Sequence, residues 1–295
     1  MAFENLIGNE KNKELLKAAV KDHNLVHSYL FTGPEGIGKD LFAKEFAQMI
    51  LCTGDEKPCH ICKSCIEFLG ESHPDFMIIK PEDGKTIKID QVRFMQEKIA
   101  EKPVTSEKKV YILSQSETMT REAANSLLKT LEEPPEYAVI ILTTSNESKL
   151  LTTIKSRCIK IHFTPIPDEK ILEYLKQHHL DSEITTNMIK QAGGSLGKLL
   201  KMTEEKEQYL GIENLLKQIE TQTITQVWSQ AEVLYQAKDN IISLLEYMVI
   251  VFDQELRKKD NLCYANAISI IEQAKQRILA NANYDMTIDD LLLKL

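Results

Sequence analysis

Short apolar runs alternate with longer amphipathic stretches along the first half of the chain. Five apolar runs have the length of buried strands: 28–32, 75–80, 109–113, 138–144 and 158–163. Four stretches carry apolar residues at helical spacing: 1–27, 41–51, 88–99 and 120–131. Strands that alternate with helices indicate an α/β fold with a parallel sheet covered on both faces. In such sheets ligands bind beyond the carboxyl ends of the strands.

The second half of the chain has a different pattern. Pro165 and Pro167 end the alternation, and only helical periodicity follows from Asp168 onward. A charged run at 204–207 separates a shorter helical segment from a longer one. We therefore predict three domains, with the α/β core first and two helical domains after it: 1–165, 166–207 and 208–295.

Composition narrows the functions that the chain can have. Its 295 residues are 43% apolar, and 36 Lys and Arg stand against 44 Asp and Glu, a net charge of −8. Domains that hold DNA alone carry a basic excess, so autonomous DNA binding is disfavoured. No signal peptide is visible, and the longest apolar run, 241–252, is shorter than the roughly 20 residues that span a bilayer. We expect a cytoplasmic protein without a membrane partner.

Residues 33–40, Gly-Pro-Glu-Gly-Ile-Gly-Lys-Asp, match the pattern G-x-x-x-x-G-K between a predicted strand and a predicted helix. In a working P-loop the backbone N–H groups surround the phosphates, the lysine reaches the outer phosphates, and a hydroxyl holds Mg²⁺. Here Asp40 stands where Ser or Thr should be. The candidate nucleotide-binding residues are Gly33, Gly36, Gly38, Lys39 and Asp40.

Four cysteines are crowded into one insert, residues 52–65. Cys52, Cys59, Cys62 and Cys65 are separated by six, two and two residues. Four thiolates at such spacing suit tetrahedral Zn²⁺ in a structural site. An iron–sulfur cluster is the alternative, but ferredoxin runs place their next Cys downstream and follow it with Pro. We favour zinc, with His60 inside the loop as a solvated bystander.

With these pieces placed, the chain resembles the delta-prime subunits of bacterial DNA polymerase III clamp loaders, within the AAA+ superfamily. The matching stretches are the four-cysteine insert and these segments: 27–39, 73–75, 123–135, 153–158 and 271–279. The resemblance covers essentially the whole chain. It implies an AAA+ P-loop core with a zinc insert, a small helical lid domain and an all-α collar domain that assembles into a pentameric ring.

The sequence departs from the ATPases of that superfamily at the metal site. Such enzymes need an Asp-Glu pair after the third strand, where this chain has Ser114 and Gln115. Glu117 comes two or three positions too late, and we expect it to turn away from the strand end. Together with Asp40, these changes remove both usual protein ligands of Mg²⁺. We expect no ATP hydrolysis, and we favour an inherited turn over an ATP-binding site. Lys198 stands where the ATPase subunits carry a nucleotide-sensing Arg.

The resemblance gives Arg157, in the segment Ser-Arg-Cys, the role of an arginine finger for a neighbouring ATPase subunit. It implies a non-catalytic member of the DNA polymerase III holoenzyme, a DNA-directed DNA polymerase. The implied partners are the gamma/tau ATPase and delta subunits in a hetero-pentameric ring, with the sliding clamp and primed DNA reached through the complex. Two alternatives are an active gamma/tau-type ATPase, which the loss of the carboxylate pair disfavours, and a stand-alone zinc DNA-binding module, which the acidic balance disfavours.

Overall fold

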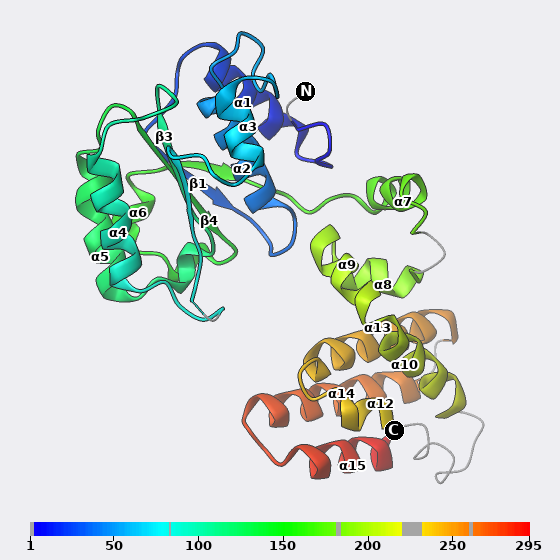
Figure 1. Cartoon of the computed structure of the whole chain (residues 1–295). Helices are drawn as coiled ribbons and strands as arrows, with labels where there is room; N and C mark the ends of the chain where they lie inside the picture. Colours follow the sequence, from blue (N-terminus) through cyan, green and yellow to red (C-terminus); the bar gives the residue numbers. More distant parts are fainter. Residues whose placement is uncertain (1–2, 83, 181–183, 220–231, 260–261) are drawn as a thin grey trace. The chain divides into compact units, whose positions relative to one another are not determined.

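The computed structural model describes residues 3–82, 84–180, 184–219, 232–259 and 262–295. The chain divides into two compact units, each described by itself below (Figure 1). The first is Met1–Lys170 with Ser195–Gly197, and the second is Ile171–Gly194 with Lys198–Leu295. The predicted collar domain includes residues 220–231, which lie outside the described residues, and the three-domain division stays a prediction.

The first unit is built on a five-stranded parallel sheet, as predicted. Its strands run in the order β2-β3-β4-β1-β5. Their bounds are β1 Ser28–Thr32, β2 Phe76–Ile79, β3 Lys109–Leu113, β4 Ala138–Thr144 and β5 Ile159–His162. Each predicted apolar run therefore contains one strand. β1 lies between β4 and β5. Its carboxyl end is therefore flanked by the carboxyl ends of two other strands, and ligands of such sheets bind beyond these ends.

Helices cover both faces of this sheet (Figure 1). Successive strand residues point to opposite faces, and since all five residues of β1 are buried, both faces need a cover. In β1, Tyr29 and Phe31 belong to a core shared with a first group of helices, and Leu30 belongs to a core shared with a second group. The first group is α1 Glu10–Lys21, α2 Lys39–Leu51 and α3 Lys63–Leu69; the second is α4 Ile89–Ala100, α5 Arg121–Glu132 and α6 Thr152–Lys155. Two 3-10 turns, η1 Ser116–Thr118 and η2 Glu147–Lys149, follow β3 and β4.

The amino-terminal helix is shorter than the sequence pattern predicted. Residues 1–27 were expected to be helical, and the helix covers only Glu10–Lys21. Phe3 lies outside it, buried against the ring of Phe42 with centroids 5.4 Å apart. Asn9 precedes the helix in a left-handed conformation, with φ 54°. Packing of Phe3 on the core and this turn therefore override the local helical pattern.

Every described element after β5 is a helix, as the periodicity predicted. The bounds are α7 Asp168–Gln177, α8 Thr186–Ala192, α9 Leu196–Glu204, α10 Lys206–Ile219, α12 Glu232–Gln236, α13 Ile241–Lys259, α14 Leu262–Leu279 and α15 Tyr284–Lys294. The rings of Tyr209 in α10 and Tyr247 in α13 meet edge to face at 5.0 Å. The hydroxyl of Thr185, the N-cap of α8, lies 2.9 Å from the Tyr247 hydroxyl. Among the described residues, no helix combines the length and the apolar character that crossing a bilayer requires.

Candidate functional site

The predicted P-loop connects β1 to α2 at the carboxyl edge of the sheet. Gly33 has φ 148°, and a Cβ built on it would lie 2.4 Å from the carbonyl oxygen of Phe163. Gly38, the N-cap of α2, has φ 93°. Side chains are rarely tolerated in such conformations. The fold itself therefore requires these glycines, so their presence alone does not indicate that a nucleotide binds.

The P-loop lysine, Lys39, donates hydrogen bonds to backbone carbonyl oxygens of its own loop. Lys39 is only 8% exposed, and its Nζ donates to the carbonyl oxygens of Gly33 at 2.8 Å and Pro34 at 2.6 Å. Burial lowers the pKa of Lys39, and three carboxylates oppose that shift: Asp40, Glu117 and Glu35. A phosphate group would have to displace these carbonyl bonds and approach the same three negative charges.

Asp40 is held by a hydrogen-bonded chain that crosses the top of the sheet. Its Oδ1 accepts from the Thr143 hydroxyl at 2.6 Å, and that hydroxyl oxygen accepts from the backbone N–H of Gln115 at 3.2 Å. The chain joins the start of α2 to the ends of β4 and β3. Ser114 follows β3 directly, and its buried Oγ has no hydrogen-bond partner among the described residues. Protein hydrogen bonds therefore lie where an ATPase would hold Mg²⁺.

The expectation that Glu117 turns away from the strand ends was wrong. Gln115 adopts a left-handed conformation with φ 52°, which redirects the chain after β3. As a result Glu117 is about half-buried, and its Oε1 accepts from the backbone N–H of Ser145, just after β4, at 2.9 Å. Burial raises the pKa of Glu117, but hydrogen bonds from Ser145 outweigh it and leave the pKa lowered. This carboxylate faces the site, and its hydrogen bonds hold it to Ser145.

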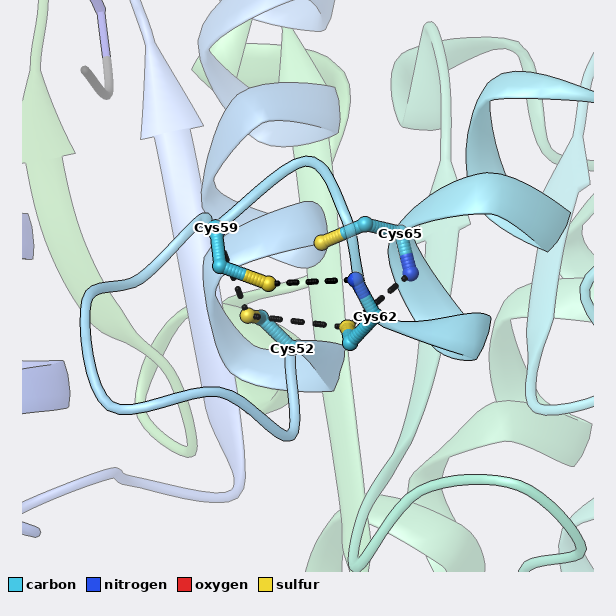
Figure 2. A group of neighbouring side chains, drawn as sticks. All are labelled: Cys52, Cys59, Cys62 and Cys65. Carbon is cyan, nitrogen blue, oxygen red and sulfur yellow. Dashed lines mark hydrogen bonds between the residues drawn. The ribbon is translucent and has the colours of Figure 1, made fainter.

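The four cysteines converge as predicted (Figure 2). Their sulfur atoms all lie within 4.8 Å of one another, and the sulfurs of Cys52 and Cys62 are 3.9 Å apart. A tetrahedron of sulfurs around Zn²⁺ has edges of about 3.8 Å. Cys52 ends α2, and Cys62 is the N-cap of α3. A Cβ on Gly54 would lie 2.9 Å from the sulfur of Cys59, so a larger residue there would displace that sulfur.

The surroundings of the four sulfurs shift their pKa values in opposite directions. Three sulfurs accept backbone N–H bonds of 3.3–3.4 Å, among them Cys62 from the N–H of Cys65. Burial raises the pKa of Cys62, but hydrogen bonds from the side chain of Thr53 and from backbone N–H groups outweigh this and lower it to about 5. Burial raises the pKa of Cys52 and of Cys65. A cation would stabilise all four thiolates together, so the cluster can hold a metal ion.

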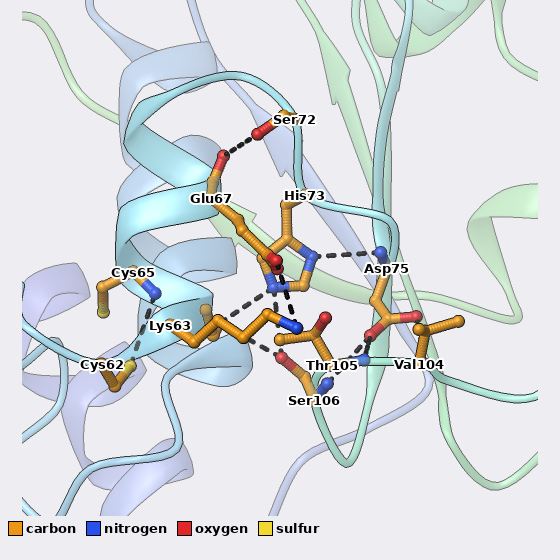
Figure 3. A network of polar contacts seen from close by, with 11 residues as sticks. Cys62, Lys63, Cys65, Glu67, Ser72, His73, Asp75, Val104, Thr105 and Ser106 are labelled. Atoms are coloured by element: carbon orange, nitrogen blue, oxygen red, sulfur yellow. Dashed lines mark hydrogen bonds and ion pairs between the residues drawn. The ribbon is translucent and has the colours of Figure 1, made fainter.

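A buried polar network beneath the cysteine loop was not assigned a role from the sequence (Figure 3). The His73 Nδ1 accepts from the backbone N–H of Asp75 at 3.0 Å, so its Nε2 carries the proton and faces the hydroxyls of Ser64 and Ser106, at 2.9 and 3.2 Å. Both hydroxyls donate to the carbonyl oxygen of Leu51, beside Cys52. Burial lowers the pKa of His73.

Asp75 anchors the other side of the same network. Its carboxylate is buried and accepts three backbone N–H groups of residues 104–106 at 2.7–2.9 Å. The segment 73–75 therefore joins α2, α3 and the loop before β3. A His and an Asp this close together could have suggested catalysis. The hydrogen bonds of His73 and Asp75 to hydroxyl and backbone groups indicate a structural role instead.

The predicted finger residue, Arg157, follows α6 at the surface. Its Nη1 donates to the carbonyl oxygen of Thr153 at 2.8 Å, and its Nη2 forms an ion pair with Glu132. The side chain is 31% exposed. Lys198, in the helical unit, lies 3.9 Å from the carboxylate of Glu246 in the same unit. Glu246 also pairs with Lys275 at 3.0 Å.

The fold and the P-loop together indicate the class of protein to which this chain belongs. A parallel sheet in this order, with a glycine-rich turn after β1 and a helical unit, is a P-loop fold of the AAA+ type. A solved DNA polymerase III gamma subunit-related protein from Thermotoga maritima has a similar fold, with a TM-score of 0.51 and 20% identity over 94% of this chain and 97% of that one.

The particular family follows from the sequence comparisons. The family model described as "DNA polymerase III, delta subunit" matches residues 8–167, and this chain belongs to that family. It is 27% identical to DNA polymerase III subunit delta' of Bacillus subtilis (strain 168), over 96% of this chain and 94% of that protein. It is 32% identical to DNA polymerase III subunit tau/gamma of Haemophilus influenzae, over 69% of this chain and 30% of that protein. The resemblance to delta-prime subunits is confirmed.

Proposed function

We propose that this chain is the non-catalytic, delta-prime-type member of a DNA polymerase III clamp loader. It works with gamma/tau ATPase and delta subunits in a hetero-pentameric ring that places the sliding clamp on primed DNA. Residues 166–207 act as the lid domain and 208–295 as the collar that joins the ring. The chain functions in the cytoplasm, because four thiols held ready for a metal need a reducing compartment.

The observation that carries the proposal is the internal hydrogen bonding of the P-loop. Lys39 is bound to carbonyl oxygens of its own loop, and Asp40 is bound to Thr143. Hydrolysis of ATP depends on groups that act together, and the carboxylate pair after β3 is absent. The candidate residues Gly33, Gly36, Gly38, Lys39 and Asp40 then serve as a fixed turn that contacts no nucleotide in the working protein.

Arg157 supplies the catalytic contribution of this subunit. We place its guanidinium in the ATP site of the neighbouring ATPase subunit, where it neutralises charge that develops on the phosphates. Fingers of this kind contribute on the order of 10³–10⁵ in rate in other NTPases. Its partial exposure and its planar fork of donors suit contact with phosphate oxygens. The metal at Cys52, Cys59, Cys62 and Cys65 is Zn²⁺ in a closed structural site, since four thiolates leave no open position.

The first experiment measures Mg²⁺-dependent ATP turnover by the purified chain, with Lys39→Ala as the control. We expect no turnover in either protein. Turnover that the lysine substitution abolishes would make the chain a motor subunit and overturn the proposal.

The second experiment tests Arg157→Ala in the reconstituted complex with the partner ATPase, clamp and primed DNA. Arg93→Ala, which removes an exposed arginine from α4, is the matched control. We expect a loss of stimulated turnover with the first variant alone. Equal turnover in both variants would remove the finger role.

A further inference from the structure

The segment Ser-Arg-Cys at 156–158 sends its three side chains in different directions. The Ser156 hydroxyl donates to the carbonyl oxygen of Thr153 at 3.1 Å, which closes the end of α6. Cys158 is buried in the core on that face of the sheet, and burial raises the pKa of its thiol to about 12. Only Arg157 directs a charged group outward. Two residues of the segment therefore fix the backbone, and the third carries the chemistry.

The guanidinium of Arg157 is held at two points. Its Nη1 donates to the backbone carbonyl oxygen of Thr153, and its Nη2 pairs with the Glu132 carboxylate. An arginine side chain offers five N–H donors, so five less these two leaves three for a phosphate. Fixing two nitrogens fixes the plane of the fork, which a long flexible side chain does not do by itself.

Glu132 stands at a position that does not favour an acidic residue. It is the last residue of α5, and a carboxylate at a helix carboxyl end meets the negative end of the helix dipole. Glu133 and two prolines follow, so the helix cannot continue. The partner that compensates the Glu132 charge is Arg157, 25 residues further along the chain.

The backbone under this pair is rigid. Leu131, next to Glu132, is 1% exposed, and Ile154, in α6, is fully buried in the same core. Both helix ends are therefore fixed by packing, and the two charged side chains meet above them. Such support is what keeps a reacting group within a fraction of an ångström of its working position.

We propose that Glu132 is a positioning residue for Arg157. It orients the guanidinium before the neighbouring ATP site forms, so that ordering the side chain does not oppose the reaction in the partner. The inference rests on the proposed role of Arg157 in trans, and it explains why an acidic residue ends α5. Glu132 acts through a hydrogen bond to Nη2, so glutamine, which keeps the accepting oxygen, replaces it and alanine does not.

The test uses the reconstituted complex of this chain with the clamp-loader ATPase and delta subunits, the sliding clamp and primed DNA. The measured quantities are kcat and KM for ATP, and the portion of kcat that Arg157→Ala removes is the Arg157-dependent turnover. The variants are Glu132→Ala, Glu132→Gln and Glu132→Ala combined with Arg157→Ala. The matched control is Glu133→Ala, which removes an adjacent exposed carboxylate with no side-chain partner among the described residues.

We expect Glu132→Ala to lower the Arg157-dependent turnover by about tenfold or more, with KM for ATP unchanged, because a misplaced catalytic group costs up to about 10² in rate. Glu132→Gln keeps at least half of that turnover, Glu133→Ala keeps all of it, and the double variant equals Arg157→Ala. Unchanged melting temperatures show that the exposed substitutions leave the fold intact.

Two results would overturn the inference separately from the proposed function. Arg157→Ala that lowers turnover while Glu132→Ala leaves it unchanged or raises it refutes positioning and keeps the finger. A loss in Glu132→Gln as large as that in Glu132→Ala also refutes positioning by a hydrogen bond. An Arg157→Ala variant with full turnover refutes the finger itself, and the inference falls with it.

Discussion

The P-loop and the cysteine cluster lie at opposite ends of the same helix, α2, and they differ in how far their polar groups are satisfied. At the P-loop, Lys39 has carbonyl partners and Asp40 has a hydroxyl partner. At the cluster, four thiols converge within 4.8 Å, and their pKa values are driven in opposite directions. The charged groups of the first site have protein partners without a ligand, whereas the thiolates of the second would share a partner if a cation bound.

This difference helps to distinguish an inherited motif from a site that binds a ligand. The P-loop has the sequence spacing of a phosphate site, but Lys39, Asp40 and the nearby Glu117 already have hydrogen-bond partners in the protein. The cysteine loop has an equally regular spacing, but the pKa values of its thiols are shifted in opposite directions. Partners that are already bound are therefore a better guide to function than spacing alone.

The largest expected effect on stability comes from removing one cysteine of the cluster. Cys62→Ser removes one thiolate, and we expect loss of the bound metal and unfolding of the loop at 52–65. Structural zinc sites in small peptides contribute about 10–16 kcal/mol, so even a fraction of that would lower the free energy of unfolding by several kcal/mol. Metal content by mass spectrometry and urea denaturation measure both effects. His60→Ala is the control and should keep one metal ion per chain.

A smaller loss is expected from the network beneath the cluster. Asp75→Asn places an amide beside three backbone N–H groups that now donate to a carboxylate. We expect the free energy of unfolding to fall by about 3 kcal/mol, because hydrogen bonds to a buried charge are lost. Urea denaturation measures it. Asp90→Asn, at an 87% exposed side chain, should change stability by less than about 0.5 kcal/mol. Similar losses in both variants would contradict the structural role of Asp75.

A double-mutant cycle on Asp40 and Thr143 tests whether their hydrogen bond stabilises the P-loop. If their hydrogen bond stabilises the closed loop, Asp40→Ala and Thr143→Val should couple by about 1–2 kcal/mol in the free energy of unfolding. Additive effects of the two substitutions would show that the bond contributes nothing. The same variants titrated with a fluorescent ATP analogue show whether opening this bond is enough to admit a nucleotide; we expect no binding while Lys39 keeps its carbonyl partners.

The smallest effect is a pH dependence that comes from His73. Burial lowers the pKa of His73 in the folded protein below its usual 6.5, against the opposing charges of Asp75 and Glu67. The unfolded chain then binds more protons, so this contribution to stability is complete above about pH 6.5 and declines as the pH falls toward the lowered value. Urea denaturation between pH 7.5 and 5 should show a decline that His73→Asn lacks. An unchanged slope in the variant would assign the decline to other groups.

Much of the fold could be read from the sequence, because apolar periodicity reports which face of an element is buried. The strands at 109–113 and 138–144 have the predicted bounds, and Thr120 caps α5 as predicted. The course of the chain after β3 could not be read in this way. One left-handed residue, Gln115, directs Glu117 toward Ser145, and no periodic pattern contains that turn.

The α/β core, the four converging cysteines and the loss of the carboxylate pair could be predicted from the sequence, since each depends on residue type at a local spacing. The partners of the remaining charged groups follow from the tertiary structure. Asp40 meets Thr143 across 103 positions, at the carboxyl ends of the strands, and Arg157 meets Glu132 across 25, at the amino ends of β4 and β5, because the fold brings distant segments together at each edge of the sheet. Hydrogen bonds act over about 3 Å, so their partners are set by packing and not by position along the chain.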